Sequence, residues 1–191
     1  MRTKGTRPRI LVLVLGLAGA IVLSVGPSSV QAHVTPVPCD WTHISMTLTT
    51  PQGGHSKAVA EAGCKDGAFI GKLSFEDKDF GPNVDSHTIT GYLQENPGLD
   101  PSDDPVRIIC GIATVDGVDG VFFRVRAYDG QHGGGSGIDT FAIRLSTGYY
   151  LPPTAGDGKA GNIVIQPTSN STPPASPPDE FTQCNGMLSP P

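Results

Sequence analysis

Short segments that alternate apolar and polar residues, separated by turns, constrain the fold of this chain most. Residues 43–49 alternate, with Ile44, Met46 and Leu48 on one side. Because successive side chains of a strand point to opposite faces, a period of two predicts a β-strand with one buried face. No stretch of ten or more residues beyond residue 32 shows a convincing helical period of 3.6. The sequence therefore predicts an all-β fold.

Further strand signals recur along the chain, each bounded by turn residues. They cover residues 69–75, 84–93, 106–115, 121–128, 139–145 and 162–166, while 57–64 is either a strand or a short helical turn. The 25 glycines and 18 prolines suit short strands joined by turns. About seven strands at intervals of roughly 10–20 residues are typical of an antiparallel sandwich or barrel. We expect an antiparallel β-sandwich of about seven or more strands.

Residues 1–32 have the layout of a secretory signal peptide. Basic Arg7 and Arg9 precede an apolar run over residues 10–25, and Val30 and Ala32 stand where a signal peptidase prefers small or aliphatic side chains. The apolar run, about 14–16 residues, is shorter than the ~20 that a membrane helix needs. We expect cleavage after Ala32, a secreted, extracellular protein, and no membrane span after cleavage.

The four cysteines, Cys39, Cys64, Cys110 and Cys184, all follow the predicted signal peptide. An even number of cysteines in an exported chain predicts two disulfide bonds. Three pairings are possible. We favour Cys39–Cys64, which closes an N-terminal hairpin, and Cys110–Cys184, which holds down the C-terminal tail.

Composition divides the exported part into three segments. Residues 33–66 form an N-terminal arm or hairpin with two of the cysteines, residues 67–166 form the β-sandwich domain, and residues 167–191 form a tail. The stretch 167–178 is rich in Pro, Ser and Thr and buries too little apolar surface to order itself. It is therefore expected to be a disordered, extended tether.

The charge balance excludes two classes of partner. The whole chain carries a net charge of −5, and the predicted signal peptide takes Arg2, Lys4, Arg7 and Arg9 with it. An acidic chain without clusters of Lys and Arg argues against binding of nucleic acid or anionic membranes. Export also removes intracellular cofactors from reach, so no cofactor is expected.

Residues 67–166 resemble a domain of bacterial secreted and surface proteins that is often labelled a post-COAP domain. The resemblance is carried by motifs of matching order and spacing, including Gly71–Phe75, Gly111–Gly117, Gly137–Ile143 and Gly161–Ile165. It implies an antiparallel β-sandwich on the outside of a bacterium, and it brings no catalytic residues with it. This chain departs from the family at Cys110 and in the cysteine-bearing N-terminal arm.

A copper site at the new N-terminus is one metal hypothesis. Cleavage after Ala32 would give His33 a free α-amine beside its imidazole, and these nitrogens together with a second histidine suit Cu(II). The candidates for the second histidine are His43, His55, His87 and His132. The alternative is that signal peptidase tolerates most residues after the cut.

A calcium site is the second metal hypothesis. Asp129 and Asp139 flank the glycine-rich loop 131–137, and carboxylates with loop carbonyls are the oxygen ligands that calcium takes. Asp is also common in turns, where its side chain binds its own backbone. Asp100, Asp103 and Asp104 are interpreted as a solvated acidic loop.

Three functions of different class remain, and the sequence favours the first. The first is a non-enzymatic exported module for surface interaction or structural use, whose partner is an extracellular protein or glycan. The second is a calcium- or carbohydrate-binding domain, with Trp41 and the tyrosines available to stack on sugars. The third is a small secreted enzyme or a copper protein that uses His33. Residues 134–138 do not complete a GxSxG motif, because Ile138 replaces the last glycine.

Overall fold

The structure is a computed structural model that describes residues 40–79, 81–96, 99–100, 102–134, 137–166, 172–174 and 179–187, without the side chains of 134 and 158–161. The described residues belong to one compact unit, Ala32–Pro191. The predicted signal peptide, the arm before residue 40 and most of the predicted tether lie outside them. In the part that is described, no helix is long and apolar enough to cross a membrane.

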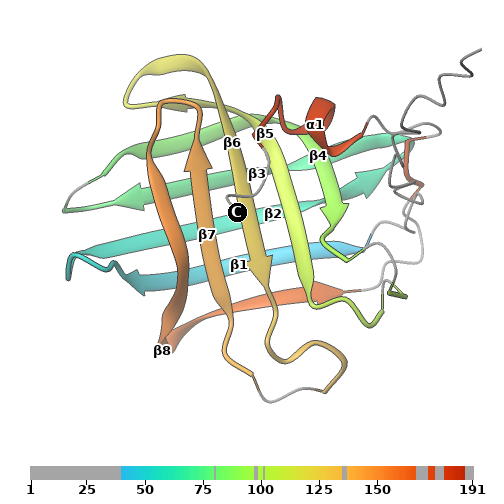
Figure 1. The fold of residues 1–191 in the computed structure, drawn as a ribbon, viewed down its shortest axis with the longest axis horizontal. Coiled ribbons are helices and arrows are strands. Elements are labelled where there is room, and N and C mark those ends of the chain that lie inside the picture. Colours follow the sequence, from blue (N-terminus) through green and yellow to red (C-terminus); the bar gives the residue numbers. More distant parts are fainter. Residues whose placement is uncertain are drawn as a thin grey trace, which may run out of the picture. The chain divides into compact units, whose positions relative to one another are not determined.

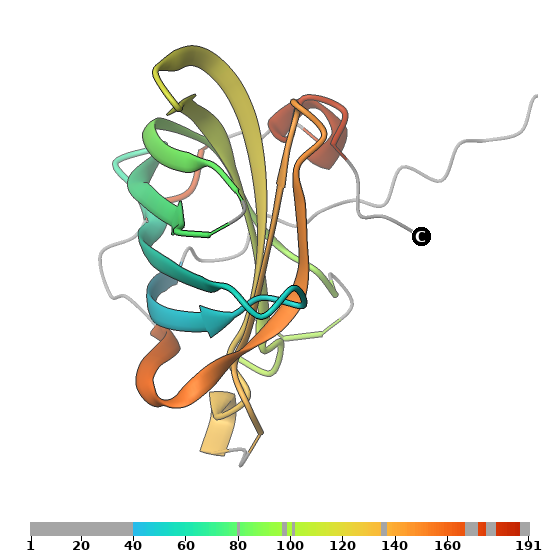
Figure 2. The ribbon, with the colours of Figure 1, turned by 90° about the vertical axis from the view of Figure 1, so that its left-hand side faces the viewer.

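Eight antiparallel strands follow one another around a closed barrel (Figure 1). Their bounds are β1 (Trp41–Thr49), β2 (His55–Lys65), β3 (Ala68–Asp77), β4 (Asn83–Gln94), β5 (Val106–Val115), β6 (Val118–Tyr128), β7 (Thr140–Leu145) and β8 (Tyr150–Gln166). A short 3₁₀ helix, η1 (His132–Gly134), precedes β7, and a short helix, α1 (Glu180–Gln183), follows β8. In Figures 1 and 2, β5–β7 cross β1–β3 on opposite sides of the core.

The predicted open sandwich is therefore wrong, and β8 is the physical reason. The first part of β8 pairs with β7, up to Ala155↔Thr140, whereas its last part pairs with β1 from Gly156↔Leu48 to Gln166↔Trp41. One long strand thus joins the two edges that a sandwich leaves open. Sequence reasoning recognised only 162–166 of β8, because prolines and glycines precede that segment. The ambiguous segment 57–64 is part of strand β2.

The interior of the barrel is packed with apolar side chains. The cluster includes the predicted inward residues of β1, which are Ile44, Met46 and Leu48, and alternate residues of β6 and β7, namely Phe123, Val125, Ala127, Phe141, Ile143 and Leu145. A small residue lies opposite a large one where Ala58 on β2 pairs with Phe75 on β3. The Phe75 ring stacks on Phe141 with 5.8 Å between ring centroids. The predicted inward face of β1 is confirmed.

A smaller apolar cluster lies on the outer face of β4 and β5. Leu93, Val106, Ile108 and Cys110 are buried there together with Cys184. The predicted Cys110–Cys184 disulfide is present and holds the segment that contains α1 on this face. Cys64 is also disulfide-bonded, and its predicted partner Cys39 lies outside the described residues.

Candidate functional site

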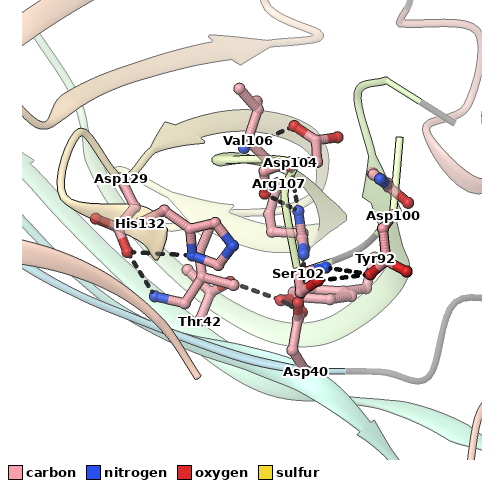
Figure 3. A network of polar contacts seen from close by, with 12 residues as sticks. Asp40, Thr42, Tyr92, Asp100, Ser102, Asp104, Val106, Arg107, Asp129 and His132 are labelled. Atoms are coloured by element: carbon pink, nitrogen blue, oxygen red, sulfur yellow. Dashed lines mark hydrogen bonds and ion pairs between the residues drawn. The ribbon is translucent and has the colours of Figure 1, made fainter. Parts of the chain in front are cut away.

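Buried polar side chains gather at one end of the barrel, which we call the polar end. It is the end at which β1, β5 and β7 begin and β4, β6 and β8 end. The buried polar residues there are Asp40, Thr42, Gln94, Asp104, Arg107, Asp129 and Asp139. Figure 3 shows most of them together with Tyr92 and His132.

Arg107 lies at the centre of this end, with only 1% of its side chain exposed. Its Nε donates to Asp40 Oδ1 at 3.0 Å and its Nη2 donates to Asp40 Oδ2, which makes the ion pair bidentate. Its Nη1 donates to the carbonyl oxygens of Asp104 at 2.8 Å and Val106 at 2.7 Å. Burial alone would lower the pKa of Arg107, but the bond and charge of Asp40 outweigh it and the pKa is raised. The guanidinium is therefore a permanent buried cation.

Tyr92 completes the cluster from the end of β4. Its hydroxyl donates to Asp40 Oδ1 at 2.5 Å and lies 2.6 Å from Thr42 Oγ1 (Figure 3). Burial, followed by the negative charge of Asp40, raises the pKa of Tyr92 well above its usual range. The phenol is therefore neutral and serves as a hydrogen-bond donor. We call Asp40, Thr42, Tyr92 and Arg107 the ionic cluster, which ties the start of β1 to β4 and β5.

Asp104 holds the long connection between β4 and β5. Its side chain is fully buried, and Oδ1 accepts from Val106 N at 3.0 Å. The carboxylate also accepts from the backbone and side-chain nitrogens of Asn96, at 2.9 and 3.2 Å. The predicted solvated loop is thus correct for the exposed Asp100 and Asp103 and wrong for Asp104.

Asp129 and Asp139 lie beside the last part of β8. Asp129 Oδ2 accepts from Ile165 N at 3.0 Å, and Asp139 Oδ2 accepts from Ile163 N at 2.7 Å. The ladder between β7 and β8 ends at Ala155, so the amides of Ile163 and Ile165 lie beyond it. The carboxylates supply the acceptors that a neighbouring strand would otherwise provide.

The remaining oxygens of the two carboxylates are engaged as well. Asp129 Oδ1 accepts from Gln131 N and Asp139 Oδ1 accepts from Gly130 N, both at 2.9 Å. All four oxygens therefore bind backbone amides, and a cation would compete with these bonds. Among the described residues, no three His, Cys, Asp or Glu side chains are grouped to hold a metal. Both carboxylates thus hold backbone amides in place, and the calcium site stays a prediction.

The four histidines considered as second copper ligands lie on different elements. His43 faces Glu61 across β1 and β2 at 4.0 Å, His55 begins β2, and His87 is exposed on β4. His132 lies in η1, with Nδ1 3.8 Å from Asp129 Oδ2 (Figure 3). His33 lies outside the described residues, so the copper hypothesis stays a prediction.

No family model, curated protein or solved structure matches this chain. Sequence reasoning missed the whole ionic cluster. One signal could have indicated it, because Arg107 is the single charged residue within the apolar run Val106–Ile109 of a predicted strand. A charge at such a position has to be paired inside the protein.

Proposed function

We propose that this protein is a secreted, non-enzymatic module for structural use or surface interaction, and that the loops of its polar end contact an extracellular protein. The bidentate Arg107–Asp40 pair carries the proposal. Its charged groups bind one another and the ends of strands, which is what a rigid base for presenting loops requires. Asp129 and Asp139 support the same reading, since their oxygens bind backbone amides of the barrel.

Two exposed apolar residues support the choice of these loops as the contact surface. Leu99, in the β4–β5 connection, is 48% exposed, and Ile138, in the β6–β7 connection, is 68% exposed. Both connections lie at the polar end. Exposed apolar side chains on loops held by a buried scaffold favour a protein partner.

Retention of the purified protein on intact producing cells tests this proposal. The double variant Leu99→Ser/Ile138→Ser is expected to lose retention, and protease treatment of the cells is expected to abolish it for the wild type. Val118→Ser is the matched control, because Val118 is 62% exposed near the opposite end of the barrel. Unchanged retention of the double variant would contradict the assignment of the surface.

The alternatives have outcomes of their own in the same experiment. Retention that survives protease but is lost after glycosidase treatment would identify a glycan partner instead. A folded His132→Gln variant that loses the biological effect would indicate chemistry at His132 and favour an enzyme.

A further inference from the structure

The pairing of β3 with β4 covers only a small part of both strands. β2 and β3 pair from Ser56↔Asp77 to Lys65↔Ala68, over the whole of β3. β3 and β4 pair only from Ser74↔Asp85 to Glu76↔Asn83, next to their connecting turn. We call the facing edges of residues 68–73 and 86–94 the seam. The ladder between β3 and β4 does not extend to these two segments.

Two β-bulges in β4 explain the seam. The register of β4 against β5 shifts between Ser86 and Thr88 and again between Ile89 and Gly91. Each extra residue bends and twists the bulged strand, so β4 follows β5 and turns away from β3. At the start of the seam Ser86 Oγ accepts from Leu73 N at 2.5 Å, which is a side-chain bond in place of a ladder bond.

The C-terminal segment makes hydrogen bonds on both sides of this seam. Gly67, immediately before β3, donates its N–H to Thr172 O at 3.0 Å. On the other side, Thr90 Oγ1 of β4 donates to Gln183 O at 2.6 Å. Gly91 makes room for this contact, because a Cβ there would lie 2.6 Å from Gln183 Cβ. We call residues 172–174 and 179–187 the strap.

Beyond the seam the strap is fastened to the next two strands. The Cys110–Cys184 disulfide attaches it to β5, and Arg124 Nη2 of β6 lies 3.0 Å from Glu180 Oε1. α1 itself is capped by Asp179, whose side chain accepts from Thr182 N. The strap is therefore bonded to Gly67 on one side of the seam and to β4, β5 and β6 on the other.

We propose that the barrel opens locally at the seam and that the strap, locked by the Cys110–Cys184 disulfide, keeps it closed. Tyr92 lies within the seam segment of β4 and belongs to the ionic cluster. Opening at the seam therefore reaches Asp40 and Arg107 first, and it leaves the ladders between β5, β6 and β7 intact. Local opening of this kind draws on segments with few backbone bonds to neighbours.

Hydrogen exchange of the oxidised wild type and of Cys110→Ala/Cys184→Ala, followed by mass spectrometry, tests the proposal. The double variant is expected to exchange amides of residues 68–73 and 87–94 about tenfold faster, with residues 121–127 of β6 unchanged. Equal acceleration in all strands, or none in the seam, would overturn the proposal.

A second pair of variants tests the strap with the disulfide intact. Thr90→Val removes the hydroxyl that donates to Gln183 and is expected to accelerate exchange in the seam several-fold. Thr88→Val, on the same strand and exposed, is the matched control and should leave exchange unchanged. Equal acceleration by both variants would refute the role of the strap. If the double cysteine variant does not fold, the comparison of Thr90→Val with Thr88→Val tests the proposal instead.

Discussion

Arg107 on β5 and Asp40 ahead of β1 form a bidentate ion pair inside the barrel, although 67 positions separate them in the sequence. The pair joins strands that are not neighbours in the ladder, since β5 pairs with β4 and β6 and β1 pairs with β2 and β8. Tyr92 and Thr42 extend it to a cluster of four residues. The pair therefore fixes how the start of β1 closes the polar end.

Asp40→Asn is expected to lower the free energy of unfolding by about 3–5 kcal/mol, because it leaves the buried Arg107 cation without its counter-charge. Urea denaturation followed by circular dichroism measures the loss. Glu61→Gln is the control, since the His43–Glu61 pair is 46% and 47% exposed and such pairs contribute about 0–1 kcal/mol. A loss below about 1 kcal/mol for Asp40→Asn would show that Arg107 finds another partner.

Stability is expected to fall as the pH rises above about 10, the ordinary pKa of tyrosine. Burial raises the pKa of Tyr92 in the folded protein, so the unfolded chain loses this proton first. The contribution of Tyr92 to the free energy of unfolding is fully present below pH ~10, and it is lost as the pH rises toward the pKa of Tyr92 in the folded protein. Unfolding curves between pH 8 and 11, set against Tyr92→Phe, measure it.

Two observations would separate Tyr92 from other causes of alkaline unfolding. Burial and Asp77 also raise the pKa of Tyr149, so Tyr149→Phe is the matched variant and each should remove only part of the pH dependence. An equally steep loss of stability in the double Tyr→Phe variant would assign the effect to other groups.

Asp139→Ala is expected to destabilise the fold by about 1–3 kcal/mol, because it leaves the buried amides of Gly130 and Ile163 without acceptors. Hydrogen exchange at Ile163 should accelerate together with this loss. Asp100→Ala, in an exposed loop, should stay within about 0.5 kcal/mol of wild type. Millimolar calcium should leave Tm unchanged, and a rise of several degrees would favour the calcium site instead.

Phe141→Ala is expected to cost about 3–5 kcal/mol, because the ring is fully buried against Phe75. This is a large part of the 5–15 kcal/mol that stabilises a typical domain, so the secreted yield should fall sharply. Val118→Ala, an exposed apolar control, should leave the yield unchanged. Equal yields for both variants would contradict the central place of Phe141 in the core.

N-terminal sequencing of secreted material is expected to begin at His33, since Val30 and Ala32 satisfy the cleavage rule. If His33 binds Cu(II), a preceding Met should abolish binding because it blocks the α-amine. A start several residues away would remove the copper hypothesis.

The sequence by itself determined most strands and which of their faces are buried. Alternation is local, so Ile44, Met46 and Leu48, or Phe141 and Ile143, can be assigned inward without knowing what they face. The Cys110–Cys184 pairing could also be anticipated, because it connects the tail to the β domain.

Only the tertiary structure decided between a barrel and a sandwich, because both need the same period of two along each strand. The choice depends on β8 pairing with β7 and β1 at once, and its first part carries Pro152 and Pro153, which locally predict a loop. The ionic cluster was equally hidden. Neither Asp40 nor Arg107 has a local pattern that names the other, and only closure of the chain brings the two charges together.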